Sequence, residues 1–299
     1  MKKNILAVIL SIFVFSLTSV NAETIDIIVT GSKTGSTNQT AQLIGKDSDG
    51  GSIKNLKLNV ISPGGACQGF QLITKQEKGK TFISHYENFY NLVAKMKNDP
   101  ACPYISFEKQ TPIFSLVQGL YLITKNDGAT LEDFSKKSFK VGYASESEIE
   151  RGWHDQLDSA FGQKHTFVAY DGSSNLRTGL ASGEVDAIWT TYTHFVRLKE
   201  VQDNYKIVLR TVDEIASVNA PVASKHFKNE KLTRAYLNTW YVFNDKQGIA
   251  KKISKSLQND FKKNKGNFGA YANSKNLIIY FDQKTQVEME KKVSWEQYK

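Results

Sequence analysis

The sequence predicts an α/β protein with two lobes, and three observations support this fold class. Short β-branched runs alternate with amphipathic stretches, a pattern typical of strand–loop–helix units in a mostly parallel sheet. Loops rich in Gly, Ser and Thr separate these runs from the stretches that follow them. The chain has 299 residues, 40% of them hydrophobic, which is enough for two domains of ordinary size. We therefore expect each lobe to be a mostly parallel sheet flanked by helices, with a helical C-terminal tail.

The first 22 residues predict export. Lys2 and Lys3 precede the apolar run 5–17, and small residues lead up to Ala22. A membrane anchor is the alternative, but the run is shorter than the roughly 20 apolar residues that a helix needs to cross a bilayer. We expect cleavage after Ala22 and a periplasmic mature protein.

The first lobe is predicted from alternating strands and helices in the first half of the chain. An apolar side recurs within 88–97 at Phe89, Leu92, Val93 and Met96, which is helical spacing. The other elements follow from β-branched runs and from the stretches between loops. We expect strands at 25–29, 56–61 and 81–83, and helices at 38–46, 69–78 and 88–97.

The second lobe is predicted to begin near residue 124. We expect a helix that opens at 130–134 and strands at 139–143, 165–170 and 185–189. A serine-rich turn and the stretch 148–161 follow the first of these strands, and a helix runs to about residue 182 after the second. From about residue 231 the chain reads as helix-rich, including 251–263, where Ile253, Leu257 and Phe261 form an apolar stripe, and 283–292. The expected organisation is lobe I from 23–123 plus 226–299 and lobe II from 124–225, with hinges near 124–125 and 210–225.

The loop after the first strand is the foremost candidate for ligand binding. Ligands of open α/β sheets bind beyond the carboxyl ends of the strands. This loop combines glycines, hydroxyls and a lysine before a helix N-terminus, which suits an anion. An ordinary loop with an N-cap at Ser36 or Thr37 is the alternative. The candidate residues are Lys33, Thr34, Gly35, Ser36, Thr37 and Asn38.

Other loops that follow strands supply further candidates. Asp-Gly pairs also serve purely local turns, and a lone histidine is often structural, so each of these residues has a structural alternative. Arg177, on the helix after one such loop, is expected at the surface. The candidates are Gly64, Gly65, Ser84, His85, Ser145, Tyr170, Asp171, Ser173 and Thr190.

The sequence favours binding over catalysis. Its five histidines have no metal-ligand spacing, and no HExxH, GxSxG, GxGxxG or P-loop motif is present. We expect neither a metal nor a cofactor. The net charge of +9 comes mostly from scattered lysines, which argues against a nucleic-acid surface and favours anionic solutes. An enzyme site formed only in three dimensions and a sensor or adhesion module remain the alternatives.

Two cysteines, Cys67 and Cys102, allow a single pairing. In an exported chain an even count favours a disulfide, and two unrelated free thiols are the alternative. Closing a loop of this size stabilises a chain by about 3–4 kcal/mol in the chain-entropy model.

Five short motifs occur in the order found in the tripartite tricarboxylate transporter receptor family, which the sequence resembles from about residue 24 to 210. They take the place of the family's Pro-Gly-Gly-x-x-Asp loop, its Pro-Gly-x-Gly-Gly loop, two loops of the second lobe and its Gly-x-Val-Asp. The stretches are 34–38, 63–67, 143–145, 170–173 and 183–186. The sequence departs from the family at Thr34 and Ser36, which replace Pro and Gly, at Asn38, which replaces Asp, and at Asp171, where a basic residue is common.

The resemblance implies an extracytoplasmic solute-binding protein of the type II periplasmic fold. Such a receptor holds one carboxylate of a small ligand between the first and second loops, with backbone amides and waters helping, and closes its lobes around it. It implies a monomer that delivers the ligand to the membrane permease of a secondary transporter or to a sensor. Asp171 would favour an amino or hydroxyl group at the far end of the ligand.

Overall fold

The computed structural model describes most of the chain after the expected signal peptide. The described residues are 23–31, 33, 35–49, 53–76, 79–87, 103, 110–144, 148–170, 172–212, 218–228 and 235–286. The expected signal peptide 1–22, the expected helix 88–97, and Thr34, Cys102, Ser145 and Asp171 lie outside these residues.

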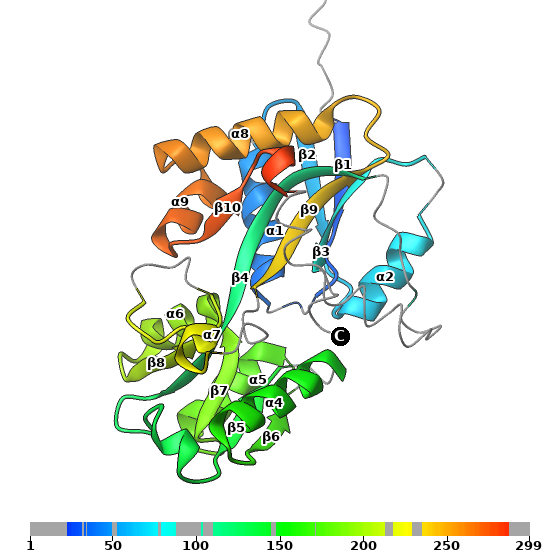
Figure 1. Ribbon diagram of the computed structural model, residues 1–299. Helices are drawn as coiled ribbons and strands as arrows, with labels where there is room; N and C mark the ends of the chain where they lie inside the picture. The colour runs from blue at the N-terminus through cyan, green and yellow to red at the C-terminus, as the bar shows by residue number, and fades with distance from the viewer. Residues whose placement is uncertain are drawn as a thin grey trace, which may run out of the picture.

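The chain forms two lobes, each a sheet flanked by helices, which Figure 1 shows above and below one another. Lobe I contains β1 (Glu23–Ile28), α1 (Ser36–Ser48), β2 (Leu56–Ile61), α2 (Ala66–Thr74), β3 (Phe82–Glu87), β9 (Ala235–Phe243), α8 (Ile249–Lys263), α9 (Asn267–Ser274) and β10 (Ile278–Tyr280). Lobe II contains η1 (Asp133–Ser135), β5 (Lys140–Tyr143), α4 (Glu148–Phe161), β6 (Thr166–Ala169), α5 (Gly172–Ser182), β7 (Ala187–Thr191), α6 (Tyr192–Val201), β8 (Tyr205–Arg210) and α7 (Ala223–His226).

The predicted strand–loop–helix units form the parallel parts of both sheets. In lobe I, β1 lies between β2 and β3, with Ile27 opposite Val60 on one side and Ile83 on the other. In lobe II, β5 lies between β6 and β7 in the same way. In lobe I, β9 runs antiparallel to β3, and in lobe II, β7 and β8 pair antiparallel with the strand β4 described next. Each sheet is therefore parallel on its outer side and antiparallel toward the middle of the molecule.

A long strand, β4 (Thr111–Lys125), belongs to both sheets. Its first part pairs with β9 and β10, from Thr111 opposite Val242 to Gly119 opposite Ala235. Its second part, from Leu120 onward, pairs with β7 and β8. The strand therefore changes lobes between residues 119 and 120, ahead of the expected boundary at 123/124, and the lobe boundaries drawn from the sequence stay a prediction.

Gly119 sits at this change of partners against a side chain of lobe II. A Cβ added at Gly119 would overlap the Val212 side chain. Val212 is buried, and its branched Cβ allows few rotamers, so it has little room to give way. We expect Gly119→Ala to lower the free energy of unfolding by about 1–3 kcal/mol, as overpacking does in a tight core.

Denaturant unfolding of four chains would check this expectation. Val212→Ala in the Gly119→Ala background should recover most of the loss, because it removes the overlapping methyls. Gly31→Ala is a matched control, since a Cβ there would meet its neighbours at 3.9 Å. Equal stability of Gly119→Ala and the parent, or no recovery in the double variant, would contradict the overlap.

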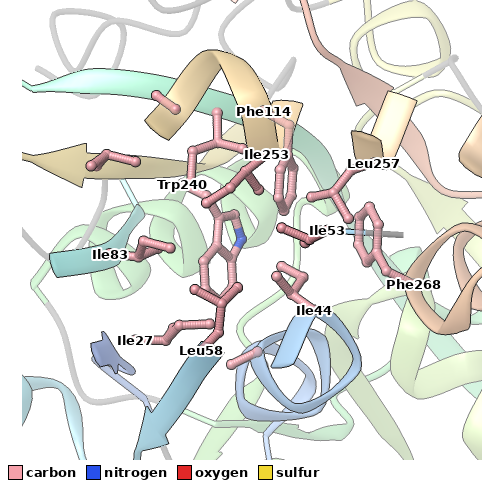
Figure 2. Packing of buried hydrophobic residues seen from close by; sticks show 14 of the residues in the cluster. Ile27, Ile44, Ile53, Leu58, Ile83, Phe114, Trp240, Ile253, Leu257 and Phe268 are labelled. Atoms are coloured by element: carbon pink, nitrogen blue, oxygen red, sulfur yellow. The ribbon is translucent and has the colours of Figure 1, made fainter. Parts of the chain in front are cut away.

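The two lobes have separate hydrophobic cores. Figure 2 shows Trp240 of β9 in the middle of the lobe I core, with Ile83 on one side and Phe114 on the other. Ile253 and Leu257 from the predicted stripe of α8 are fully buried there, and Phe261 packs against them. The lobe II cores are built mainly on β4, β7, β8, α4 and α5. Each lobe thus packs its helices against its own sheet around a core of its own.

The C-terminal segment contributes strands as well as the expected helices. α8 and α9 cover the lobe I sheet, and β9 and β10 enter it on both sides of β4. The sequence had indicated only helix in this segment. Within the described ranges, no helix is long and apolar enough to cross a membrane.

Candidate functional site

The loops after β1 and β2 lie side by side because those strands are parallel and in register. The Asn38 side chain joins them: its Nδ2 donates to the Lys33 carbonyl oxygen at 2.5 Å, and its Oδ1 accepts from the Ser62 hydroxyl. Gly64, in the loop after β2, lies against the Lys33 side chain of the loop after β1: a Cβ on Gly64 would be 3.9 Å from Lys33 Cε. The structure therefore brings Lys33, Asn38 and Gly64 together, and it commits the Asn38 amide to holding the two loops.

Ser84 and His85 support this loop from inside lobe I. Ser84 Oγ donates to the Ile28 carbonyl oxygen at 2.7 Å. His85 is fully buried and its Nε2 accepts from the Thr30 backbone N–H at 2.9 Å. Burial lowers the pKa of His85 to about 3, so the ring is neutral at neutral pH. Both residues fasten β3 to the end of β1, and neither lines the pocket described next.

A pocket lies between the lobes, beside the change of partners in β4. It encloses about 510 Å³ of space, including the part open to solvent. From lobe I it is lined by the first two turns of α1, with Ser36, Thr37 and Thr40. From lobe II it is lined by Thr191, Tyr192 and Thr193, where β7 ends and α6 begins.

The helix N-termini on the two sides of this pocket carry no side-chain caps. Gly35 precedes α1 and Thr191 precedes α6; both have extended backbones, and neither forms a side-chain capping bond. The first N–H groups of a helix have no partner within the helix and carry a partial positive charge. Two such ends facing one pocket favour an anionic ligand.

Thr191 adds a second sign of a polar ligand. Its side chain is buried, with 8% of its surface exposed, and it lines the pocket. Among the described residues its Oγ1 has no hydrogen-bond partner. A buried hydroxyl without a partner is costly, so a partner supplied by a ligand would remove that cost.

The lobes touch each other next to the pocket. From α6, Arg197 donates to Gln39 Oε1 of α1, and Glu200 pairs with Lys275 beyond α9. Tyr271 of α9 lines the pocket, and its hydroxyl donates to the same Gln39 oxygen at 3.3 Å. These contacts hold α1, α6 and α9 around one side of the pocket.

Arg177 has a structural partner in lobe II. Its Nη1 lies 3.0 Å from Nδ1 of the buried His194, and because a guanidinium only donates, the ring nitrogen accepts. Burial first, and then the charges of Arg177 and Arg197, lower the pKa of His194 to about 3. The sequence had indicated a surface position for Arg177. In the structure Arg177 is half-buried against α6.

The remaining predicted residues lie elsewhere in the two lobes. Tyr170 packs over Gly142 and Gly179, and burial together with Glu184 raises its pKa. Ser173 is on the first turn of α5, Thr190 is buried in β7, and Gly65 precedes α2. Of the predicted residues within the described ranges, Ser36 and Thr37 line the pocket.

Several pocket residues were missed by sequence reasoning. Most of them come from β4, β9, α9 and the start of α6, elements that sequence reasoning had not placed at these positions. Thr191 and Tyr192 carried some signal, since they directly follow the candidate Thr190 at the end of the strand expected at 185–189. The missed residues are Thr40, Leu116, Val117, Gly119, Tyr121, Thr191, Tyr192, Thr193, Asn238, Tyr271, Leu277 and Ile278.

The sequence matches no family model and no curated protein. The fold, in contrast, matches many solved structures. A periplasmic transporter superposes with a TM-score of 0.71 at 14% identity, over 92% of this chain and 95% of that one. An adipate-bound protein of Rhodopseudomonas palustris gives 0.69 at 13%, over 92% and 96%. The periplasmic binding protein BugD gives 0.68 at 13%, over 92% and 95%.

The chain has the fold of the TctC and BugD solute-binding proteins. Malate-bound MatC of R. palustris shares it too, with a TM-score of 0.66. These matches confirm the two-lobed architecture that the sequence predicted. At 13–14% identity they establish the fold, and the ligand has to be argued from the pocket itself.

Proposed function

We propose that this protein is an extracytoplasmic receptor that binds a small carboxylate between its lobes and delivers it to a membrane transporter. One observation carries the proposal: two uncapped helix N-termini, one from each lobe, line the same interlobe pocket. The fold neighbours bound to malate and adipate support it.

In the proposed complex the ligand carboxylate lies between the first turns of α1 and α6. Backbone N–H groups of the two turns and the hydroxyls of Ser36, Thr37 and Thr191 would donate to it. Because donors come from both lobes, the ligand would draw the lobes together. The contacts of Arg197 and Lys275 would then hold the closed form.

Thr191→Val gives the sharpest test of this site. The substitution keeps the shape of the side chain and removes a buried hydroxyl that has no partner among the described residues. We expect unchanged or higher thermal stability and an affinity for the bound carboxylate that is about tenfold lower. Calorimetric titration with aliphatic and aromatic carboxylates measures the affinity. Thr178→Val, on an exposed position of α5, is the matched control.

Two results would contradict the proposal. Affinity unchanged by Thr191→Val would show that this hydroxyl does not meet the ligand. No heat or thermal shift with any carboxylate, together with a response to a sugar or an amine, would show a different ligand class.

We propose binding without turnover. Among the described residues that line the pocket, tyrosine is the sole titratable type, so the lining offers no carboxylate, histidine or lysine for acid–base chemistry. Recovery of the ligand unchanged after long incubation with the protein would agree with this proposal. A new product would favour the alternative of an exported enzyme.

We also propose that the mature protein starts at Glu23, lies in the periplasm and carries a Cys67–Cys102 disulfide. β1 begins at Glu23, directly after the expected cleavage site. Intact mass measured on periplasmic protein should correspond to residues 23–299, and alkylation without reduction should add nothing. A mass that retains the first 22 residues, or two alkylated thiols without reductant, would contradict the respective part.

A further inference from the structure

One wall of the interlobe pocket is apolar. β10 pairs with β4 so that Ile278 is opposite Val117, and Leu277 precedes it. These residues and Leu116 line the pocket on the side formed by the β4–β10 pair. Leu277 packs at the edge of the lobe I core and Ile278 at the edge of a lobe II core, so the wall continues across both lobes.

Aromatic rings extend this wall. The rings of Tyr121 and Tyr192 lie 5.7 Å apart, and both residues line the pocket. Tyr271 also lines it, and its hydroxyl is directed to Gln39. Ring faces offer large apolar contact area to a ligand.

None of the described residues that line the pocket carries a charge. Two of the neighbouring cations are occupied: Arg197 donates to Gln39, and Lys275 pairs with Glu200. A single carboxylate would be served by the two helix N-termini. A second carboxylate lying against the β4–β10 wall would lose water without gaining a cationic partner, which is strongly unfavourable.

We propose that the ligand is a monocarboxylate with an apolar aliphatic or aromatic body, rather than a di- or tricarboxylate. This inference rests on the proposed function and specifies the end of the ligand that the helix N-termini do not hold. The carboxylate lies at the first turns of α1 and α6, and the apolar body lies on the β4–β10 wall and the tyrosine rings.

Matched ligand pairs test the inference on the full mature chain. Hexanoate and adipate have the same number of carbons and differ by one terminal carboxylate, as do butanoate and succinate. Calorimetric titration should give a Kd for hexanoate at least tenfold below that for adipate. The same order should hold for butanoate and succinate.

A charge placed on the wall should remove most of the preference for the monocarboxylate. Leu277→Arg puts a guanidinium where the second carboxylate of adipate would lie, and we expect the ratio of adipate to hexanoate affinity to rise about tenfold. Leu277→Met is the matched apolar control and should leave the ratio unchanged. Because the parent chain already separates the two ligands, the inference stays testable if Leu277→Arg does not fold.

The outcomes separate this inference from the proposed function. Adipate binding as tightly as hexanoate, and weakened by Thr191→Val, would overturn the monocarboxylate inference and leave the receptor proposal standing. A folded Leu277→Arg chain with an unchanged ratio would show that the ligand does not reach the β4–β10 wall. Failure of these four and of the aromatic carboxylates to bind would overturn both.

Discussion

Lowering the pH from about 7 to about 5 should reduce the free energy of unfolding by about 4 kcal/mol through two buried histidines. His85 and His194 have pKa values of about 3 in the folded chain, against an ordinary value of 6.5. Between these two pH values the unfolded chain binds more protons than the folded chain does. The contribution of the two histidines to the free energy of unfolding is therefore fully present above about pH 6.5. It falls as the pH is lowered, by about 2 kcal/mol for each histidine at pH 5.

The geometry explains why neither ring accepts a proton easily. His85 Nε2 accepts from the Thr30 N–H, and protonation would end that bond inside a fully buried site. His194 Nδ1 accepts from Arg177, and protonation would place a third positive charge beside Arg177 and Arg197. Both rings are held neutral by burial and by the donors that face them.

Two variants divide the effect between the histidines. His85→Gln carries an amide oxygen near the position of Nε2, and His194→Asn carries one near Nδ1, so each keeps a neutral acceptor. Denaturant unfolding at pH 7 and pH 5 should show that each variant loses about 2 kcal/mol less on acidification than the parent chain. Exposed His226 offers the control His226→Gln, which should retain the full loss.

The acid effect of His194 should not reach ligand binding at pH 5. His194 directly follows Thr193 at the first turn of α6, which lines the pocket. Because the pKa of His194 in the folded chain is about 3, the ring stays neutral in nearly all folded molecules at pH 5. Any change in carboxylate affinity between pH 7 and pH 5 should therefore be the same in the parent and in His194→Asn. A larger fall of affinity in the parent, or an equal acid loss of stability in all chains, would contradict the pKa shifts.

The strands and helices of the βα units could be predicted because their pattern is local. β1, β2, β5 and β6 are short runs that contain apolar or β-branched residues, each followed by a polar loop, and the structure has strands at these places. The antiparallel strands were harder to recognise. β4 is interrupted in sequence by Pro112 and Gly119, and β9 carries Asn238 and Thr239.

Those polar positions in β9 fit a strand through contacts that are distant in sequence. Thr239 Oγ1 lies 2.9 Å from the buried Ser115 hydroxyl of β4, and Asn238 Nδ2 donates to Thr37 Oγ1 at 3.4 Å. A buried hydroxyl or amide in a strand is satisfied by whichever strand or helix lies beside it. Sequence periodicity contains no information about those partners.

The candidate site shows the same limit. Ser36 and Thr37 could be found because a glycine-rich loop before a helix is a local pattern. The opposite side of the pocket required knowing that β4 passes from one sheet to the other and places the start of α6 opposite α1. The β4–β10 wall depends on the pairing of segments that are far apart in the chain.

Asp47→Asn should lower the free energy of unfolding by about 3 kcal/mol. Asp47 is fully buried near the end of α1. One of its carboxylate oxygens accepts from the Asn267 N–H at 2.6 Å and from Asn267 Nδ2 at 2.8 Å. The other accepts from the Phe268 N–H at 3.0 Å. Asp47 thereby caps the N-terminus of α9, whose own N-cap residue, Gly266, has no side chain for that role.

An asparagine at this position would keep one acceptor oxygen and turn an NH2 group toward the donors at the start of α9. Asp49→Asn, an exposed change at the end of the same helix, is the matched control and should alter stability by less than about 0.5 kcal/mol. A loss for Asp47→Asn no larger than that of the control would contradict the capping role.

The same substitution links lobe I stability to the pocket. α9 presents Tyr271 to the pocket and precedes Leu277 and Ile278 of its apolar wall. If Asp47 positions α9, Asp47→Asn should weaken carboxylate binding even at temperatures where the variant is fully folded, and hexanoate should lose more affinity than butanoate, because its longer body covers more of the wall. Equal loss for both ligands would place the effect at the helix N-termini, and unchanged affinity would show that α9 keeps its position without this cap.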